Sequence, residues 1–160
     1  MTIFSLLQLL VLFLAALATG ALMVNWIGLG RAMERLSSPA YVEFHQATNH
    51  TFVPYMPIVM VGAALGGVAL AALPPGSTTV SGHLALLGAL CYAAIIAFTL
   101  ATDARINRQI AGWTIARPPE NWMKVRARWI RFHILRTLVS IPALLSYLAS
   151  VMLLSGGTNS

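Results

Sequence analysis

Long apolar stretches separated by polar connections dominate the pattern of this chain, and four of them are long enough to cross a lipid bilayer. A membrane-spanning helix needs about 20 consecutive, mostly apolar residues. The four stretches lie at residues 3–30, 54–73, 83–104 and 127–154. They predict an all-α integral membrane protein whose four helices pack into one bundle, with residues 1–160 forming a single domain.

The second helix is expected to begin well before its apolar part. Ser37 and Ser38 followed by Pro39 predict a helix start, because a hydroxyl side chain can cap the first turn and proline fits within it. The helix is therefore extended back to about Pro39. Pro54 and Pro57, near the start of the apolar part, should bend it, because proline cannot donate a backbone hydrogen bond.

Positive charge is restricted to two parts of the chain. All ten Lys and Arg residues lie in the ranges 31–53 and 103–140, whereas the connection at 74–82 and the tail at 155–160 carry none. Successive spans alternate in direction, so the first and third connections share one side of the membrane. The positive-inside rule predicts that this side is cytoplasmic. Both termini are then expected on the non-cytoplasmic side of a membrane, with the bacterial inner membrane as the expected location.

Composition supports lipid rather than water as the main solvent. Only 9% of the residues are charged and 58% are hydrophobic, whereas soluble domains carry roughly a quarter charged residues. The net charge of +6 does not indicate nucleic acid, because the basic residues lie at helix ends, where anionic lipid headgroups account for them. A lone cysteine, Cys91, excludes an internal disulfide and a Cys-rich zinc or iron–sulfur site.

Polar side chains gather on one face of the extended second helix. At about 100° per residue, five of them fall within an arc of roughly 160°: Glu43, His45, Gln46, Asn49 and His50. The arc either lines a polar pocket or faces cytoplasmic water. The pattern does not show which of the two histidines would point into a pocket.

The fourth helix carries a narrower polar stripe. Its members recur at steps of three and four residues and are Trp122, Arg126, Trp129, His133, Arg136 and Ser140. Arg128 and Arg131 point away from the stripe and are expected to reach lipid phosphate. His133 and Arg136 lie inside the apolar run. An arginine at that depth is costly unless it faces protein or water and finds a partner.

The third and first helices supply further polar groups. Tyr92, Thr99, Asp103 and Asn107 share one face of the third helix. Asp103 is expected to approach Arg136 or Arg126 across the bundle. Asn25 lies near the cytoplasmic end of the first helix. The four helices therefore predict one polar pocket at the cytoplasmic end, beneath an apolar roof.

The residue types in this pocket suit proton transfer. Histidine titrates near neutrality, buried arginine or asparagine can stabilise an oxyanion, and tryptophan offers a flat apolar wall. This set fits removal of a proton from an acidic aromatic substrate. An electron-rich anion of that kind can react with dioxygen without a cofactor. Phosphate-binding loops, the HExxH zinc motif and nucleophile elbows are absent from the sequence.

Two other classes of function remain open from the residues alone. His45, His50 and His133, with Glu43 as a fourth ligand, could bind a metal ion, and opposed histidines on the second and fourth helices could ligate haem. The other class is a non-catalytic role in binding lipid or a partner protein. The sequence leaves the oligomeric state and the substrate open.

Three segments resemble a known family. They are VEFHQATNHTFVPYMP at 42–57, INRQI at 106–110 and NWMKVRARWIRFHILRT at 121–137. They are similar to the anthrone-oxygenase-like membrane proteins, a family of small four-span proteins first described as a domain of unknown function. The resemblance implies oxidation of anthrones to anthraquinones without a tightly bound cofactor. It also implies functional roles for Asn107, Trp122, Arg128, Trp129, His133 and Arg136, although Arg128 lies off the helical stripe.

The resulting prediction is a cofactor-independent oxygenase, or a related proton-abstracting enzyme, acting on a lipophilic aromatic substrate and dioxygen. His133 is expected to be the general base, and Arg136 and Asn107 to steady the anion. His45 or His50 would serve as a second base or relay. The remaining substrate contacts are expected from Trp122, Trp129, Arg126, Gln46, Asn49, Asn25 and Asp103.

Overall fold

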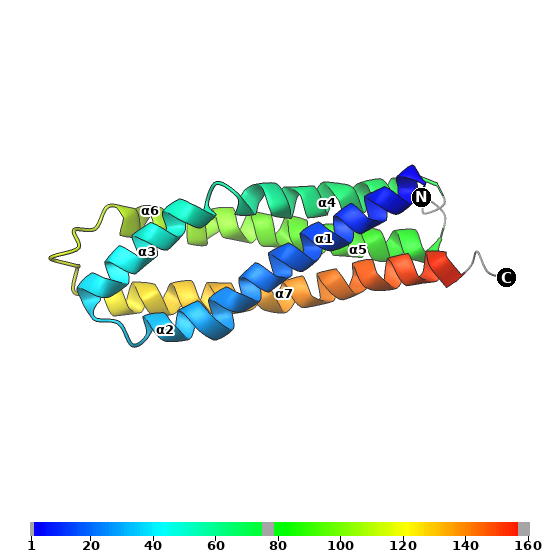
Figure 1. Cartoon of the computed structure of the whole chain (residues 1–160). Helices are drawn as coiled ribbons and strands as arrows, with labels where there is room; N and C mark the ends of the chain where they lie inside the picture. The colour runs from blue at the N-terminus through cyan, green and yellow to red at the C-terminus, as the bar shows by residue number, and fades with distance from the viewer. Residues whose placement is uncertain (1, 75–78, 157–160) are drawn as a thin grey trace.

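The computed structural model describes residues 2–74 and 79–156, and within them every regular element is a helix (Figure 1). The uncharged connection at 74–82 and the tail at 155–160 lie in part outside the described residues. In chain order the elements are α1 (Ile3–Val24), the π-helical turn η1 (Asn25–Gly30), α2 (Arg31–Met33), α3 (Ser38–Phe52), α4 (Met56–Ala72), α5 (Val80–Ala101), α6 (Asp103–Ala111) and α7 (Trp122–Gly156).

The first apolar stretch forms one long helix, because α1, η1 and α2 follow one another without a break from Ile3 to Met33. Thr2 caps its start, where the hydroxyl accepts a hydrogen bond from the backbone N–H of Ser5. The wider π-helical turn lies in the last third of this helix.

The second segment is two helices, not the continuous helix expected from the sequence. α3 and α4 meet at a bend of 45°. Pro54 and Pro57 lie at this junction and cannot donate backbone hydrogen bonds, so the helical ladder is interrupted. The bend predicted from these prolines is confirmed. Ser37 occupies the capping position before α3 as expected, but its side chain makes no capping hydrogen bond.

The helices of the third and fourth segments extend beyond their apolar stretches, toward the end of the molecule that holds α3. α5 and α6 join at Thr102, where the backbone leaves helical geometry (φ −123°, ψ −76°), and helix continues to Ala111. α7 begins at Trp122 and has 35 residues, with Pro142 inside it. The polar residues of both segments are therefore presented by regular helix.

Three helices of the described chain are long and apolar enough to cross a membrane, and the bent pair α3–α4 makes a fourth if it counts as one span. Large apolar side chains such as Ile58, Leu65 and Leu90 are at least half exposed along these helices. Such a surface requires lipid as its solvent. The helices indicate an integral membrane protein.

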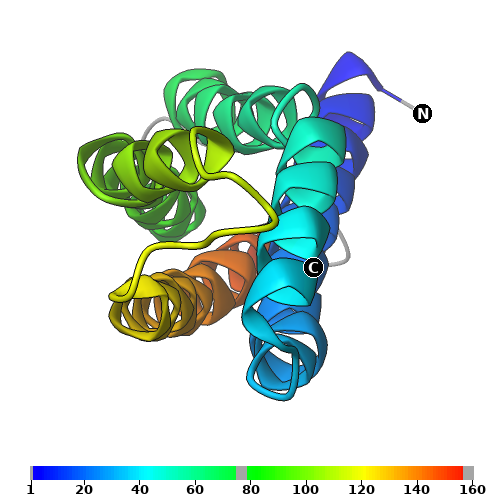
Figure 2. The same cartoon turned by 90° about the vertical axis from the view of Figure 1, so that its left-hand side faces the viewer.

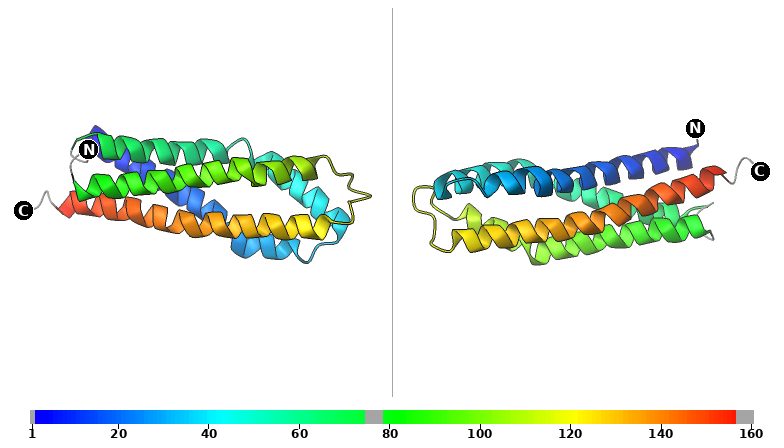
Figure 3. Two further views of the ribbon diagram at one scale, coloured as in Figure 1. Left: turned by 180° about the vertical axis from the view of Figure 1, so that it is seen from behind. Right: turned by 90° about the horizontal axis from the view of Figure 1, so that it is seen from below.

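The long helices lie lengthwise beside one another, and each of α1, α4, α5 and α7 contacts two of the others (Figures 1 and 3). Viewed from the end that holds α3 and α6, the helices surround a common interior (Figure 2). The start of α1 and the end of α7 lie at the opposite end (Figure 1). The interior therefore runs from the end that holds α3 and α6 to the end where α1 begins and α7 ends.

The end away from α3 is tightly packed around two tyrosines. Tyr147 of α7 reaches across to α4 and donates a hydrogen bond to the Ala63 carbonyl oxygen at 2.8 Å. Tyr92 of α5 reaches across to α1 and donates to the Ala15 carbonyl oxygen at 2.9 Å. The two rings stack with centroids 6.0 Å apart. Gly67 adjoins this pair, and a Cβ there would approach the Tyr147 ring to 2.6 Å, closer than atoms pack.

Replacing Gly67 by alanine should therefore destabilise the protein. The added methyl group would displace Tyr147 and break its hydrogen bond to Ala63, at a cost of about 1–3 kcal/mol. Thermal unfolding in detergent should show a lower midpoint for Gly67→Ala. Gly20→Ala is the matched control, because no atom lies within 4 Å of a Cβ at Gly20. Equal midpoints for the two variants would contradict this packing.

Candidate functional site

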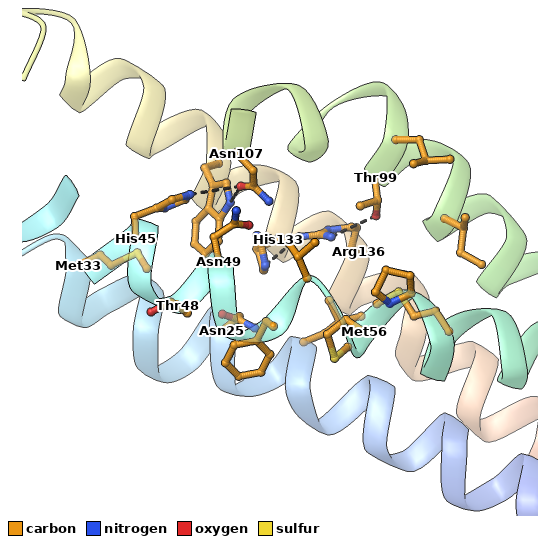
Figure 4. Close-up of a pocket in the computed structure, with 18 residues that line it drawn as sticks. Asn25, Met33, His45, Thr48, Asn49, Met56, Thr99, Asn107, His133 and Arg136 are labelled. Atoms are coloured by element: carbon orange, nitrogen blue, oxygen red, sulfur yellow. Dashed lines mark hydrogen bonds between the residues drawn. The ribbon is translucent and has the colours of Figure 1, made fainter. Parts of the chain in front are cut away.

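A cavity of about 170 Å³ lies toward the end of the molecule that holds α3 and α6 (Figure 4). Every helical element from α1 to α7 contributes to its wall. Most of the wall is apolar, and the polar groups come from a limited set of side chains. These are Asn25, His45, Thr48, Asn49, Thr99, Asn107, His133 and Arg136.

The charged member of this wall is Arg136, which is only 6% exposed. Its Nη1 donates to the Thr99 hydroxyl at 3.1 Å, and its Nη2 donates to Asp103 Oδ1 at 3.2 Å. Asp103 is 1% exposed. The ion pair predicted between these residues is confirmed. It offsets part of the cost of burying a guanidinium group in an apolar setting.

Both ring nitrogens of His133 have partners. Arg136 Nη2 lies 2.8 Å from Nδ1 and 2.7 Å from Nε2, and Asp103 Oδ1 lies 3.4 Å from Nδ1. A guanidinium group only donates and a carboxylate only accepts. The arrangement therefore fits an imidazole with its proton on Nδ1, facing Asp103, and an Nε2 that accepts from Arg136. His133 belongs to the ion-pair group.

Asn107 organises the other half of the polar wall. Its Oδ1 accepts a hydrogen bond from Trp129 Nε1 at 3.0 Å and lies 3.2 Å from His45 Nε2. An amide oxygen cannot donate, so His45 must carry a proton on Nε2. In the neutral imidazole, Nδ1 is then the unprotonated nitrogen. The sequence predicts that Asn107 steadies an anion, which stays a prediction; the structure shows its amide oxygen bonded to His45 and Trp129.

Two cavity-lining side chains have buried polar atoms without a hydrogen-bond partner among the described residues. These atoms are His45 Nδ1 and Arg136 Nε. Buried polar groups are normally hydrogen-bonded. His45 Nδ1 can accept a hydrogen bond and Arg136 Nε can donate one. Tyr41 Oη is a third such atom at this end, but Tyr41 does not line the cavity.

Arg126 and Trp122, expected to contact substrate, lie outside the cavity. The Arg126 guanidinium stacks over the Trp122 ring at 4.7 Å and over the Tyr41 ring at 5.8 Å. Its Nη1 donates to the Met33 carbonyl oxygen at 2.9 Å. The polar stripe of α7 is longer than the cavity, which ends at Trp129. These side chains close the end of the bundle and tie α7 to α2 and α3.

Gln46 and Asp103 also do not line the cavity; they bond to groups next to it. Gln46 Nε2 donates to the carbonyl oxygens of Ile110 at 2.9 Å and Trp113 at 3.0 Å. It therefore satisfies the end of α6, whose last carbonyls lack helical partners. Asp103 pairs with Arg136, which does line the cavity. Sequence periodicity identified Gln46 and Asp103 as inward-facing, but it could not distinguish residues that line the cavity from residues that hold the lining residues in place.

The structure distinguishes the two histidines of α3. His45 is 2% exposed and lines the cavity, because the same face of α3 buries Tyr41 and Val42. His50 and Glu43 are exposed. His50 lines a neighbouring groove that shares His45, Asn49 and Asn107 with the cavity. It is therefore not in the position expected for a catalytic residue inside the pocket.

Asn25 and Asn49 line the cavity as expected for substrate contacts. Asn25 begins the π-helical turn, and its Nδ2 donates to the Ala21 carbonyl oxygen at 2.9 Å. Sequence reasoning missed most of the apolar wall. The signal that could have indicated it is a set of flexible side chains that fit irregular spaces, namely Met33, Met56 and Met60.

The proposed metal ligands do not converge. No group of three His, Cys, Asp or Glu side chains within the described ranges is placed to hold a metal ion. For haem, the two inward histidines would have to face an open space between them. Instead the ring of Trp129 contacts both, with centroids 5.1 Å from His45 and 3.8 Å from His133.

Removing the acidic half of the ion pair should destabilise the protein strongly. Asp103→Leu would leave Arg136 charged and without a carboxylate, at a cost of roughly 3–5 kcal/mol. The double variant Asp103→Leu/Arg136→Met should recover most of the lost stability, because no unpaired charge remains. Thermal unfolding of the two single variants and the double variant measures this coupling. Additive losses would show that the pair does not act as a unit.

The comparisons with known proteins agree with the sequence resemblance. No curated protein and no solved structure matches the chain. A family model described as anthrone oxygenase matches residues 44–146, from α3 to α7. The matched segment contains His45, Asn107, His133 and Arg136, and it spans more than half of the chain. The chain belongs to the anthrone oxygenase family.

Proposed function

We propose that the protein is a membrane-embedded, cofactor-independent oxygenase, or a related proton-abstracting enzyme, for a lipophilic aromatic substrate. The observation that carries this proposal is the cavity itself: an apolar wall with one polar pole, where a lone pair on His45 and an N–H of Arg136 lack partners. Family membership supports an oxygenase-like activity and an aromatic substrate.

The size of the cavity limits what it encloses. Its volume is about 170 Å³, and an engineered apolar cavity of roughly 150 Å³ binds benzene. A fused-ring substrate such as an anthrone would therefore place its reacting ring inside and extend part of its body beyond the enclosed space. The indole of Trp129 offers a flat surface to the enclosed ring.

The reaction begins with loss of a proton from the acidic CH₂ carbon of the substrate. The C–H bond breaks and the proton binds an imidazole nitrogen. The electron pair delocalises through the ring system onto the carbonyl oxygen of the substrate. Arg136 Nε–H donates to that oxyanion in a site of low polarity, where such a bond is strong. The anion then reduces dioxygen, forming a carbon–oxygen bond. The peroxide anion takes the proton back from the imidazole and becomes a hydroperoxide. Loss of water then breaks the O–O bond and the remaining C–H bond of the same carbon and leaves a ketone; one oxygen atom of dioxygen enters the ketone and the other enters water.

His45 is the base in this proposal. The sequence assigned this role to His133, but its two nitrogens face Arg136 and Asp103. His45 Nδ1 has no such competitor, and the Asn107 bond fixes the tautomer that leaves it unprotonated. His133 instead accepts a hydrogen bond from Arg136 and helps to hold the guanidinium group in position. A general base must have a nitrogen lone pair that no other group already occupies, and this condition favours His45 over His133.

The site is proposed to face the cytoplasmic side of a bacterial inner membrane. In this arrangement the chain forms one four-helix bundle and a single domain, with α3–α4 as the second span and both termini on the non-cytoplasmic side. The positive charges support this orientation, because they lie at the end of the molecule that contains α2, α6 and the start of α7.

His45→Gln tests the base. Glutamine retains an N–H for Asn107 but has no basic nitrogen, so anthrone oxidation in proteoliposomes should fall by about 100-fold or more in kcat. KM should change little, since the cavity keeps its shape. The readout is anthraquinone formation with dioxygen consumption. His83→Gln is the matched control, because His83 is exposed at the opposite end of α5.

The same assay separates the two histidines. His133→Gln should weaken the anion-binding pole and reduce kcat less than His45→Gln does. The opposite order would return the base to His133. Full turnover by both variants, with wild-type folding, would remove the enzymatic proposal altogether.

A further inference from the structure

We propose that the aromatic ligand reaches the cavity sideways from the bilayer, through a mouth formed by Phe52, Val53, Pro57 and Leu100. This inference rests on the proposed function for the identity of the ligand. It adds a route and a ligand class: a neutral, flat molecule already dissolved in lipid. The route itself can be tested without catalysis.

The first observation is the exposure of the cavity wall. Most lining residues are buried or half-buried, whereas Val53 is 51% exposed and Leu100 66% exposed. Phe52 and Pro57 are exposed as well. All four are apolar, so the most exposed lining residues of the cavity carry apolar side chains. Water is a poor solvent for such an opening, and lipid is a good one.

The break between α3 and α4 explains why an opening exists there. Pro54 and Pro57 interrupt the helix and α3 turns away by 45°. α4 packs on α1 and α5, whereas α3 packs on α6. Val53, in the segment between them, lines the cavity together with Leu100 near the end of α5. Tyr55 and Ile58, which flank the mouth in sequence, are 67% and 70% exposed, so the apolar surface continues around it.

The alternative route from the cytoplasmic end is blocked by packed side chains. Met33, Tyr41, Ile110, Val125 and Trp129 form a cluster there, with none more than 6% exposed. Arg126 and Trp122 stack against the same end. A ligand coming from water along the bundle axis would have to displace this cluster.

The groove beside His50 is the other candidate route. It shares His45, Asn49 and Asn107 with the cavity, but five of its six lining residues have polar side chains. Such a surface suits water and offers a neutral fused ring no compensation for desolvating amide and imidazole groups. The groove fits release of the water formed in the reaction better than uptake of the aromatic substrate.

Nitroxide accessibility tests where the mouth lies. Single cysteines replace Val53, Leu100 and Leu90 in turn in a Cys91→Ala background, and each is spin-labelled in detergent before reconstitution. Leu90→Cys is the matched control, because Leu90 is 59% exposed on the same helix as Leu100 but does not line the cavity. Collision with dioxygen reports lipid exposure, and collision with a water-soluble nickel chelate reports water exposure.

Labels at positions 53, 100 and 90 should all favour dioxygen over the nickel chelate by more than tenfold. Addition of anthrone should reduce label mobility at 53 and 100 but not at 90. Preferential collision of the 53 and 100 labels with the nickel chelate would overturn the lipid route. Anthrone-insensitive labels at both mouth positions would also overturn it and would favour an acyl chain as the occupant.

Kinetics then distinguish failure of the route from failure of the enzyme. Val53→Trp and Leu100→Trp should lower kcat/KM for anthrone by about tenfold, whereas Leu90→Trp and His50→Trp should not. A loss confined to His50→Trp would assign access to the polar groove while leaving the oxygenase proposal intact. Anthrone-sensitive labels without any turnover would support the mouth and refute the oxygenase.

Discussion

The Arg136–Asp103 pair is the interaction on which this end of the molecule depends. A guanidinium group that is 6% exposed among apolar helices must keep its carboxylate partner. That requirement holds α6 against α7 and fixes where Thr99 and His133 can lie. The ion pair therefore sets the register of the polar wall. Its near neutrality also means that the remaining N–H of Arg136 can donate to an anion without an exposed full positive charge attracting water.

The interior is tightly packed at one end and contains a cavity toward the other. Stacked tyrosines fill the space at one end and approach a glycine without a gap. At the other end, α3 bends away, and methionines and small polar groups line a cavity. Rigid packing at one end gives the helices fixed positions, and the imperfect packing at the other gives them a cavity. A protein of this length can hold a defined site in lipid because only part of its interior is left unfilled.

Sequence reasoning predicted the features that follow from strong local constraints. The apolar stretches and the paired prolines predicted the long helices and the bend. Asp103 could be predicted as the partner of Arg136 because few acidic residues are near and an unpaired buried charge is costly. The positions of Asn25, Asn49 and Asn107 also followed from helical faces. Their roles as site residues remain predictions.

The remaining features depend on helix rotation and on where the cavity ends, which periodicity does not specify. Burial of Tyr41 and Val42 turns His45 inward and leaves His50 outside. Arg126 continues the stripe of Arg136, yet it lies beyond Trp129 and contacts a backbone carbonyl instead of the cavity. Gln46 points inward toward the end of α6, whose position depends on the turn after Ala111. Each outcome is set by tertiary packing.

The contribution of the first helix has an evolutionary consequence. The match to the family begins at residue 44, yet Leu22, Asn25 and Met33 from the preceding segment line the same cavity. This wall lies apart from the ion pair and from the hydrogen bonds that orient His45. Changes in α1 or in its π-helical turn can therefore reshape the cavity while the polar groups around Arg136 stay in place. In the proposed enzyme, that helix would be the least disruptive place for a change of substrate preference to begin.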